Sequence, residues 1–238
     1  MHTLIDQAGP FTLPTGWHEV TTRQFCASDP LLTVEARAGY FAGRPIQVNE
    51  RVADALEWML TPPPTEVPWQ MDLGQCCYLA VETMRAALAG AVLSDAFEPV
   101  YGLYSACHFA DVFGEPFNQV RATNKAAACA GWPITSTYPA VIHCLAELER
   151  LATKYAELAQ PDPTEAARRA REAGADELLG MFGHFNVARA LSQQMGRTLD
   201  EVYQLPYETV CIYLLHDRRT AILTDNLHRN STSSPAHD

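Results

Sequence analysis

The chain contains 238 residues, 47% of them hydrophobic, and its formal net charge is -11. This composition is typical of a globular protein with a substantial core, and it excludes wholesale disorder. Lysine occurs only at Lys125 and Lys154 and most arginines are dispersed, so nucleic acid is not an expected partner, because phosphate binding needs a concentrated basic surface.

The N-terminal region predicts an arm followed by short helices. Glycines and prolines punctuate residues 1–16, which predicts an extended arm with strand character confined to residues 11–13. Thr21 begins a Thr-x-x-Gln cap before a first short helix. A second helix is expected to start at Asp29-Pro30 and to close at Gly43.

Three consecutive prolines give the clearest internal break. Asn49 is a candidate N-cap for a helix whose apolar residues recur at helical spacing, and Pro62–Pro64 stop that helix. We therefore expect a small N-terminal helical unit over residues 1–60 and a proline-rich linker over residues 61–68.

The middle of the chain predicts longer helices. Leu73, Cys77, Ala80, Met84 and Leu88 fall on one face of a helix. The aromatic-rich stretch 94–113 predicts one or two buried helices, whereas small residues predict flexibility in 125–131. Tyr138-Pro139 precedes a nearly heptad-spaced stretch that predicts the longest helix, ended by Pro161.

The C-terminal part carries the clearest helix-start signals. Thr164 can cap an almost wholly polar helix, and Thr198 with Glu201 forms the pattern of a capping box. Pro206 suits the first turn of a last helix. One apolar stripe then contains Tyr207, Val210, Cys211, Leu214 and Leu215.

These elements predict an all-α protein, an irregular multi-helix bundle in which residues 69–229 form the main helical domain. Residues 230–238 are expected to be a disordered tail. The longest apolar runs are too short to span a bilayer, and the N-terminus shows no secretory pattern, so the expected location is cytoplasmic. The oligomeric state stays open.

Two segments resemble the ends of phage and prophage tail assembly chaperones. They are LPTGWHEVTTRQF (13–25) near the start and LDEVYQLPYETVCIYL (199–214) near the end. The resemblance covers less than half of the chain. It implies a small helical protein that binds the tape measure protein while a tail is built. Separately, no cofactor is expected.

Metal or catalytic chemistry is the competing interpretation. Cys107-His108 and His143-Cys144 could contribute ligands to a zinc site, but adjacent helical residues point about 100° apart. We expect the seven cysteines to be reduced core thiols. No Gly-x-Ser-x-Gly or phosphate-loop pattern occurs, so we predict no enzymatic activity and no metal site.

Aromatic residues are the candidate partner-binding residues, because aromatic anchors dominate interface energetics. The hypothesis assigns this role to Trp17, Phe182, Phe185, Tyr203 and Tyr207. The first functional hypothesis is a non-enzymatic tail assembly chaperone that binds a helical tape measure protein. The alternatives are a structural component of a tail or virion, and a helical enzyme or metal-binding protein that uses His and Cys.

Overall fold

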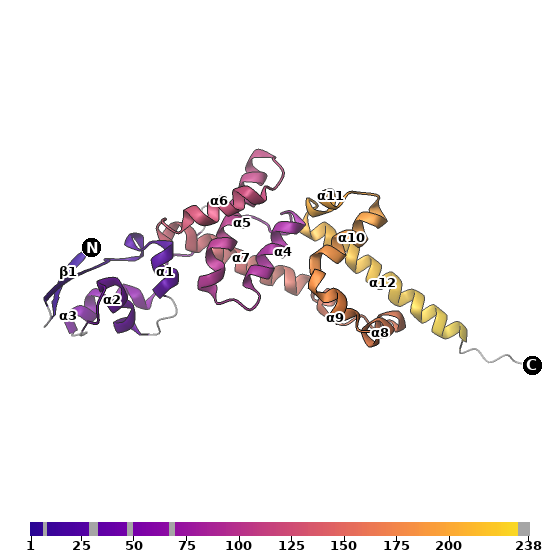
Figure 1. Ribbon diagram of the computed structural model, residues 1–238, viewed down its shortest axis with the longest axis horizontal. Coiled ribbons are helices and arrows are strands. Elements are labelled where there is room, and N and C mark those ends of the chain that lie inside the picture. The colour runs from indigo at the N-terminus through magenta and orange to yellow at the C-terminus, as the bar shows by residue number, and fades with distance from the viewer. Residues whose placement is uncertain (7–8, 29–32, 47–49, 67–69, 233–238) are drawn as a thin grey trace, which may run out of the picture. The chain divides into compact units, whose positions relative to one another are not determined.

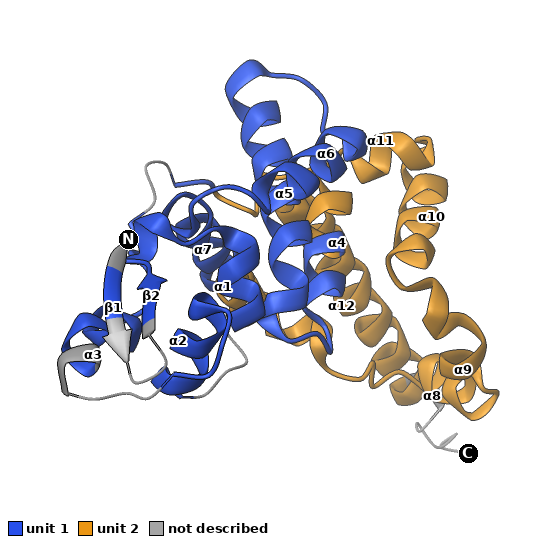
Figure 2. Cartoon of the chain, turned by 60° about the vertical axis from the view of Figure 1, so that its left-hand side comes forward, with its two compact units in different colours: residues 1–71, 83–147 blue, residues 72–82, 148–238 orange. Residues whose placement is uncertain are grey.

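The computed structural model describes residues 1–6, 9–28, 33–46, 50–66 and 70–232 (Figure 1). The fold is largely all-α, with 72% helix and 5% strand, as predicted. The chain divides into two compact units, one formed by residues 1–71 and 83–147 and the other by residues 72–82 and 148–238 (Figure 2). The division falls inside two helices, α4 (Tyr78–Leu88) and α7 (Ile134–Lys154).

The first unit begins with an antiparallel hairpin of β1 (His2–Asp6) and β2 (Gly9–Leu13), in which Leu4 lies opposite Phe11. The expectation of an extended arm was therefore incomplete, because β1 pairs along the whole of β2. Short helices follow: η1 (Trp17–Glu19), α1 (Thr22–Ser28), α2 (Val34–Ala42), α3 (Glu50–Ala55) and η2 (Glu57–Leu60).

These short elements bury a small core. Phe11, Leu13, Ala38, Leu56 and Met59 form one buried cluster. This cluster explains why such short helices are ordered, since helical stability comes mostly from tertiary packing of an apolar face.

Local capping predictions in this region are partly confirmed. Thr21 and Gln24 form the reciprocal cap before α1, with the Gln24 amide donating to the Thr21 hydroxyl at 3.3 Å. Gly43 ends α2 in the left-handed conformation (φ 69°). Thr33 is the N-cap of α2. The predicted starts at Asp29-Pro30 and Asn49, and the last residues of the linker 61–68, lie outside the described residues.

Longer helices complete the first unit: α5 (Leu93–Phe113), α6 (Gln119–Cys129) and most of α7. The α5 helix passes so close to α6 that Gly102 faces the backbone of Ala122 and Ala126. The prediction of flexibility in residues 125–131 was wrong, because α6 extends to Cys129 and packs on α5. Pro139 lies inside α7 rather than before it.

The second unit contains the start of α4 and the end of α7, followed by a chain of helices. These are η3 (Ala156–Ala159), α8 (Glu165–Glu172), α9 (Ala175–Leu179), η4 (Gly180–Phe182), α10 (Gly183–Met195), α11 (Leu199–Tyr203) and α12 (Tyr207–Thr232). The longest helix is α12, with 26 residues, so the prediction that the helix after Tyr138-Pro139 is longest was wrong.

Both predicted caps of this unit are present. The Thr164 hydroxyl accepts from the Ala167 amide, and Thr198 with Glu201 forms a complete capping box. Pro206 directly precedes α12. Because α12 continues to Thr232, residues 230–232 of the expected tail are helical, whereas residues 233–238 lie outside the described residues.

A backbone pairing joins the loop before α4 to the start of α12. The Tyr78 amide donates to the Leu205 carbonyl at 2.8 Å, and the Tyr207 amide donates to the Cys76 carbonyl at 2.8 Å. The helix expected to include Leu73 therefore begins only at Tyr78, because the Gly74 and Cys76 carbonyls accept from the Glu208 and Tyr207 amides of α12.

Candidate partner-binding surface

The two most exposed large apolar side chains of the second unit lie three residues apart in sequence. Within residues 178–185, which we call the apolar segment, Met181 is 83% exposed and Leu178 is 69% exposed. Leu179, Phe182 and Phe185 are also exposed. Exposed apolar patches of this kind are a common feature of protein-binding sites.

Short helices and glycines hold the apolar segment at the surface. It spans the end of α9, the single turn η4 and the start of α10. Gly183 has a φ of +26°, a conformation that residues with a side chain rarely adopt. The side-chain amide of Asn186 donates to the Leu179 carbonyl at 2.9 Å. Ala188 and Leu191 anchor α10 in the core. These contacts hold the backbone of the segment in place while its apolar side chains remain exposed to solvent.

Three of the five predicted partner-binding aromatics lie in or beside this segment. The Phe182 and Phe185 rings are 6.4 Å apart between centroids. Tyr203 is half-buried, and its ring lies 6.1 Å from the His184 imidazole. Burial raises the pKa of the Tyr203 hydroxyl, which therefore stays neutral and able to donate a hydrogen bond.

The other two predicted aromatics are core residues. Trp17, in the first unit, is buried, and its indole donates to the Thr61 carbonyl at 2.8 Å. Tyr207 is buried and stacks on Tyr78 with a centroid distance of 6.0 Å. Neither ring presents a surface to a partner, so the binding hypothesis has no structural basis at these two positions.

A second apolar surface runs along α12. Ile212, Leu223 and Leu227 are each close to 60% exposed. A shallow groove of about 400 Å³ is lined by Ile212, Leu215, His216, Arg219, Thr220 and Leu223. Leu215, predicted to lie on the apolar stripe of the last helix, is only half-buried and faces the groove.

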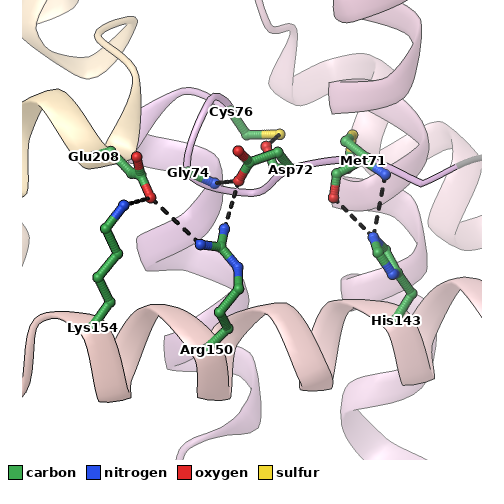
Figure 3. A network of polar contacts seen from close by, with 8 residues as sticks. All are labelled: Met71, Asp72, Gly74, Cys76, His143, Arg150, Lys154 and Glu208. Carbon is green, nitrogen blue, oxygen red and sulfur yellow. Dashed lines mark hydrogen bonds and ion pairs between the residues drawn. The ribbon is translucent and has the colours of Figure 1, made fainter.

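The ionic contacts of the second unit stabilise its own fold. The Arg150 guanidinium lies 2.6 Å from the Asp72 carboxylate, and the Lys154 ammonium lies 2.7 Å from Glu208 (Figure 3). The hydrogen bond from Lys154 to Glu208 raises the pKa of Lys154. Glu208 also packs on Gly74, where a Cβ would meet its side chain. These contacts support the pairing between the loop before α4 and α12.

Three of the four candidate metal ligands are buried or hydrogen-bonded within the fold. His143 Nε2 lies 2.8 Å from the Met71 carbonyl oxygen (Figure 3), and Cys107 and Cys144 are buried. In the ranges that the structure describes, no three His, Cys, Asp or Glu side chains gather as they would around a metal ion.

All but one of the cysteines are core residues, as predicted; Cys26 is partly exposed. Six of the seven are buried. Burial raises the pKa of the Cys77 and Cys129 thiols to about 12. A thiol that remains protonated at neutral pH is a poor nucleophile, because the thiolate is the reactive form.

The comparisons with known proteins give no match: no family model, no curated protein and no solved structure is similar to this chain. Across the described ranges, no helix has the length and hydropathy needed to cross a membrane.

Proposed function

We propose that this protein is a non-enzymatic tail assembly chaperone of a phage or prophage, acting in the cytoplasm. In this proposal the apolar segment binds an amphipathic helix of the tape measure protein. The observation that carries the proposal is the exposure of five large apolar side chains within residues 178–185. The resemblance of residues 13–25 and 199–214 to such chaperones supports the choice of client.

The apolar segment suits a helical client. A helix before assembly exposes an apolar stripe that would aggregate, and an apolar surface can cover that stripe without any sequence-specific contact. Asp176 and Glu177 precede the segment at the start of α9, and His184 and Tyr203 border it. The site is therefore an apolar centre with polar neighbours, which is the usual composition of a protein interface.

The energy available from this surface indicates a reversible complex. Burying a half-exposed large apolar side chain contributes about 1 kcal/mol, so five of them contribute about 5 kcal/mol. Loss of translational and rotational freedom costs about 4 kcal/mol or more. The apolar segment is thus an anchor that needs further contacts from the client, and release of the client at assembly is feasible.

Titration of the purified chain with the tape measure protein, or with peptides from its helices, tests the proposal. Binding should be accompanied by a negative heat-capacity change and should persist in moderate salt, because apolar burial carries it. Met181→Asp with Phe182→Asp should weaken binding at least tenfold, since each carboxylate would have to be desolvated in the complex.

Val112→Asp is the matched control, because Val112 is an exposed apolar residue of the first unit, at 57%. Equal loss of binding in both variants would contradict the assignment to the apolar segment. Purified tail particles that contain the protein stoichiometrically would instead favour the alternative of a structural component.

A further inference from the structure

The outward face of α12 carries three regularly spaced aliphatic residues, with a histidine and a threonine between them, that the fold leaves exposed. Ile212, His216, Thr220, Leu223 and Leu227 follow one another at intervals of three or four residues. Ile212 with Leu223 and His216 with Leu227 repeat after eleven residues, a period that keeps a stripe straight along an α-helix. We call these five residues the outer stripe.

Much of α12 lacks the burial that normally stabilises a helix. Its first turn is anchored by Tyr207, Val210 and Cys211, which are buried. Arg218 then donates to the carbonyls of Gln160 and Pro161 at 2.9 Å. From residue 219 to residue 230, by contrast, no residue is buried. A helix of this length is marginal in water on its own, so additional packing is expected there.

We infer that the outer stripe is covered by the outer stripe of a second copy of this chain, with the two α12 helices antiparallel. A two-fold axis between residues 219 and 220 would place Ile212 opposite Leu227 of the second copy, and Leu223 opposite His216. Each aliphatic residue near one end of the stripe then meets a residue of the other end, so the face is self-complementary, as a two-fold interface requires.

The antiparallel direction follows from where α12 is supported. In this arrangement, the exposed C-terminal half of each helix lies on the N-terminal half of the other helix, which its own unit holds in place. In a parallel pair the two exposed halves would meet only each other. The antiparallel pair therefore gives each weakly supported half a fixed surface.

Charge near the axis does not oppose this pairing. Arg219, the cation closest to the axis, lies 2.7 Å from the Glu157 carboxylate of the same chain. The hydrogen bond from Arg219 lowers the pKa of Glu157, which therefore stays ionised and balances the guanidinium at neutral pH. His216 would lie against an aliphatic residue, Leu223 of the second copy, on which the flat imidazole ring can pack.

The oligomeric state of the full chain, measured by light scattering after size exclusion over a hundredfold concentration range, tests the inference. The contact between two outer stripes is small compared with a standard interface of about 1,600 Å², so we expect a dimer that dissociates on dilution. Leu223→Asp should shift the midpoint of dissociation at least tenfold toward higher concentration. Met181→Asp, in the apolar segment, should leave it unchanged.

A chain that stays monomeric at every concentration overturns the inference, and so does a dimer that Leu223→Asp does not weaken. Because Leu223 is 59% exposed, its replacement should not disturb folding, which thermal unfolding followed by circular dichroism will verify. This test uses no client, so its outcome is independent of the proposed chaperone function.

Disulfide cross-linking determines the direction of the helices. Thr220→Cys lies next to the axis and should link to itself across the dimer. Leu227→Cys should not, because the two copies of residue 227 would be about 22 Å apart at 1.5 Å per residue. A mixture of Ile212→Cys and Leu227→Cys chains should link, with the unsubstituted chain as the control for native thiols. Self-linking of Leu227→Cys indicates a parallel pair and overturns the proposed register.

Discussion

Replacing Gly102 by alanine should destabilise the protein although alanine is the better helix former. A Cβ at this position would lie 2.8 Å from the Ala126 Cβ and 2.9 Å from the Ala126 amide nitrogen, and closer still to the Ala122 carbonyl oxygen. These atoms belong to the α6 backbone or to a methyl group, and none can rotate away. The α5 and α6 helices must therefore separate to admit the methyl group.

The magnitude follows from two opposing effects. Overpacking a core typically costs about 1–3 kcal/mol. Alanine in place of glycine in a helix returns up to about 1 kcal/mol. More than one backbone atom is contacted, so the steric cost lies at the upper end of its range, about 3 kcal/mol, and we expect a net loss of about 2 kcal/mol. For a chain of this size that corresponds to a fall in Tm of about 4–8 °C.

Thermal and urea unfolding followed by circular dichroism measure this loss. Gly131→Ala is the matched control, since no atom lies within 4 Å of the added methyl group and the backbone φ at this glycine is not positive. The control should unfold at the parent temperature or slightly above it. A Gly102→Ala chain as stable as the control would refute the close approach of α5 and α6.

Three further predictions concern the interior and one cap. Thr22→Val should cost about 1 kcal/mol because it removes the 2.7 Å hydroxyl contact with Thr137, and the double change with Thr137→Val should cost less than the two single changes together. Cys77 and Cys129 should resist alkylation at pH 8 in the native chain and react after denaturation. Burial raises the pKa of both thiols from 9.0 to about 12, so they ionise first in the unfolded chain. The free energy of unfolding should therefore decline as the pH rises from 9 to 12. Rapid native alkylation at either position would contradict their burial. Thr198→Ala should cost about 1 kcal/mol through loss of the cap, whereas Thr224→Ala on α12 should be nearly neutral.

Local hydrogen-bond chemistry explains which helix boundaries the sequence could predict. The caps at Thr21, Thr164 and Thr198 are formed as expected, because donor and acceptor lie within three residues of each other. The start of α4 was misplaced because the Gly74 and Cys76 carbonyls accept from the amides of Glu208 and Tyr207, more than a hundred residues away. No local pattern encodes such a partner.

The candidate site shows the same limit. Aromatic character identified Phe182 and Phe185, which are exposed, but it equally selected Trp17 and Tyr207, which are buried. Side-chain type does not encode whether a ring faces the core. Met181, the most exposed residue of the apolar segment, was missed, although glycines on both sides of it indicate a turn too short to bury its side chain.

The N-terminal hairpin was predicted only in part, as strand character at residues 11–13, because no longer stretch alternates polar and apolar residues. The glycine-proline pair before Phe11 suggested a break, yet Pro10 is paired in β2 opposite Ile5. Proline is tolerated in such an edge position, where its missing amide hydrogen is not needed by the ladder. The hairpin therefore depends on Phe11 and Leu13 reaching the cluster around Ala38, which is a tertiary contact.

Co-expression with the tape measure protein, the proposed client, tests the chaperone proposal most directly. The measured quantity is the soluble fraction of that protein with the parent chain, with the Met181→Asp and Phe182→Asp double variant, and with Val112→Asp. The proposal predicts a higher soluble fraction and a co-eluting complex with the parent chain and with Val112→Asp, and neither with the double variant. A client that is equally soluble alone and forms no complex at micromolar concentration would contradict the proposal.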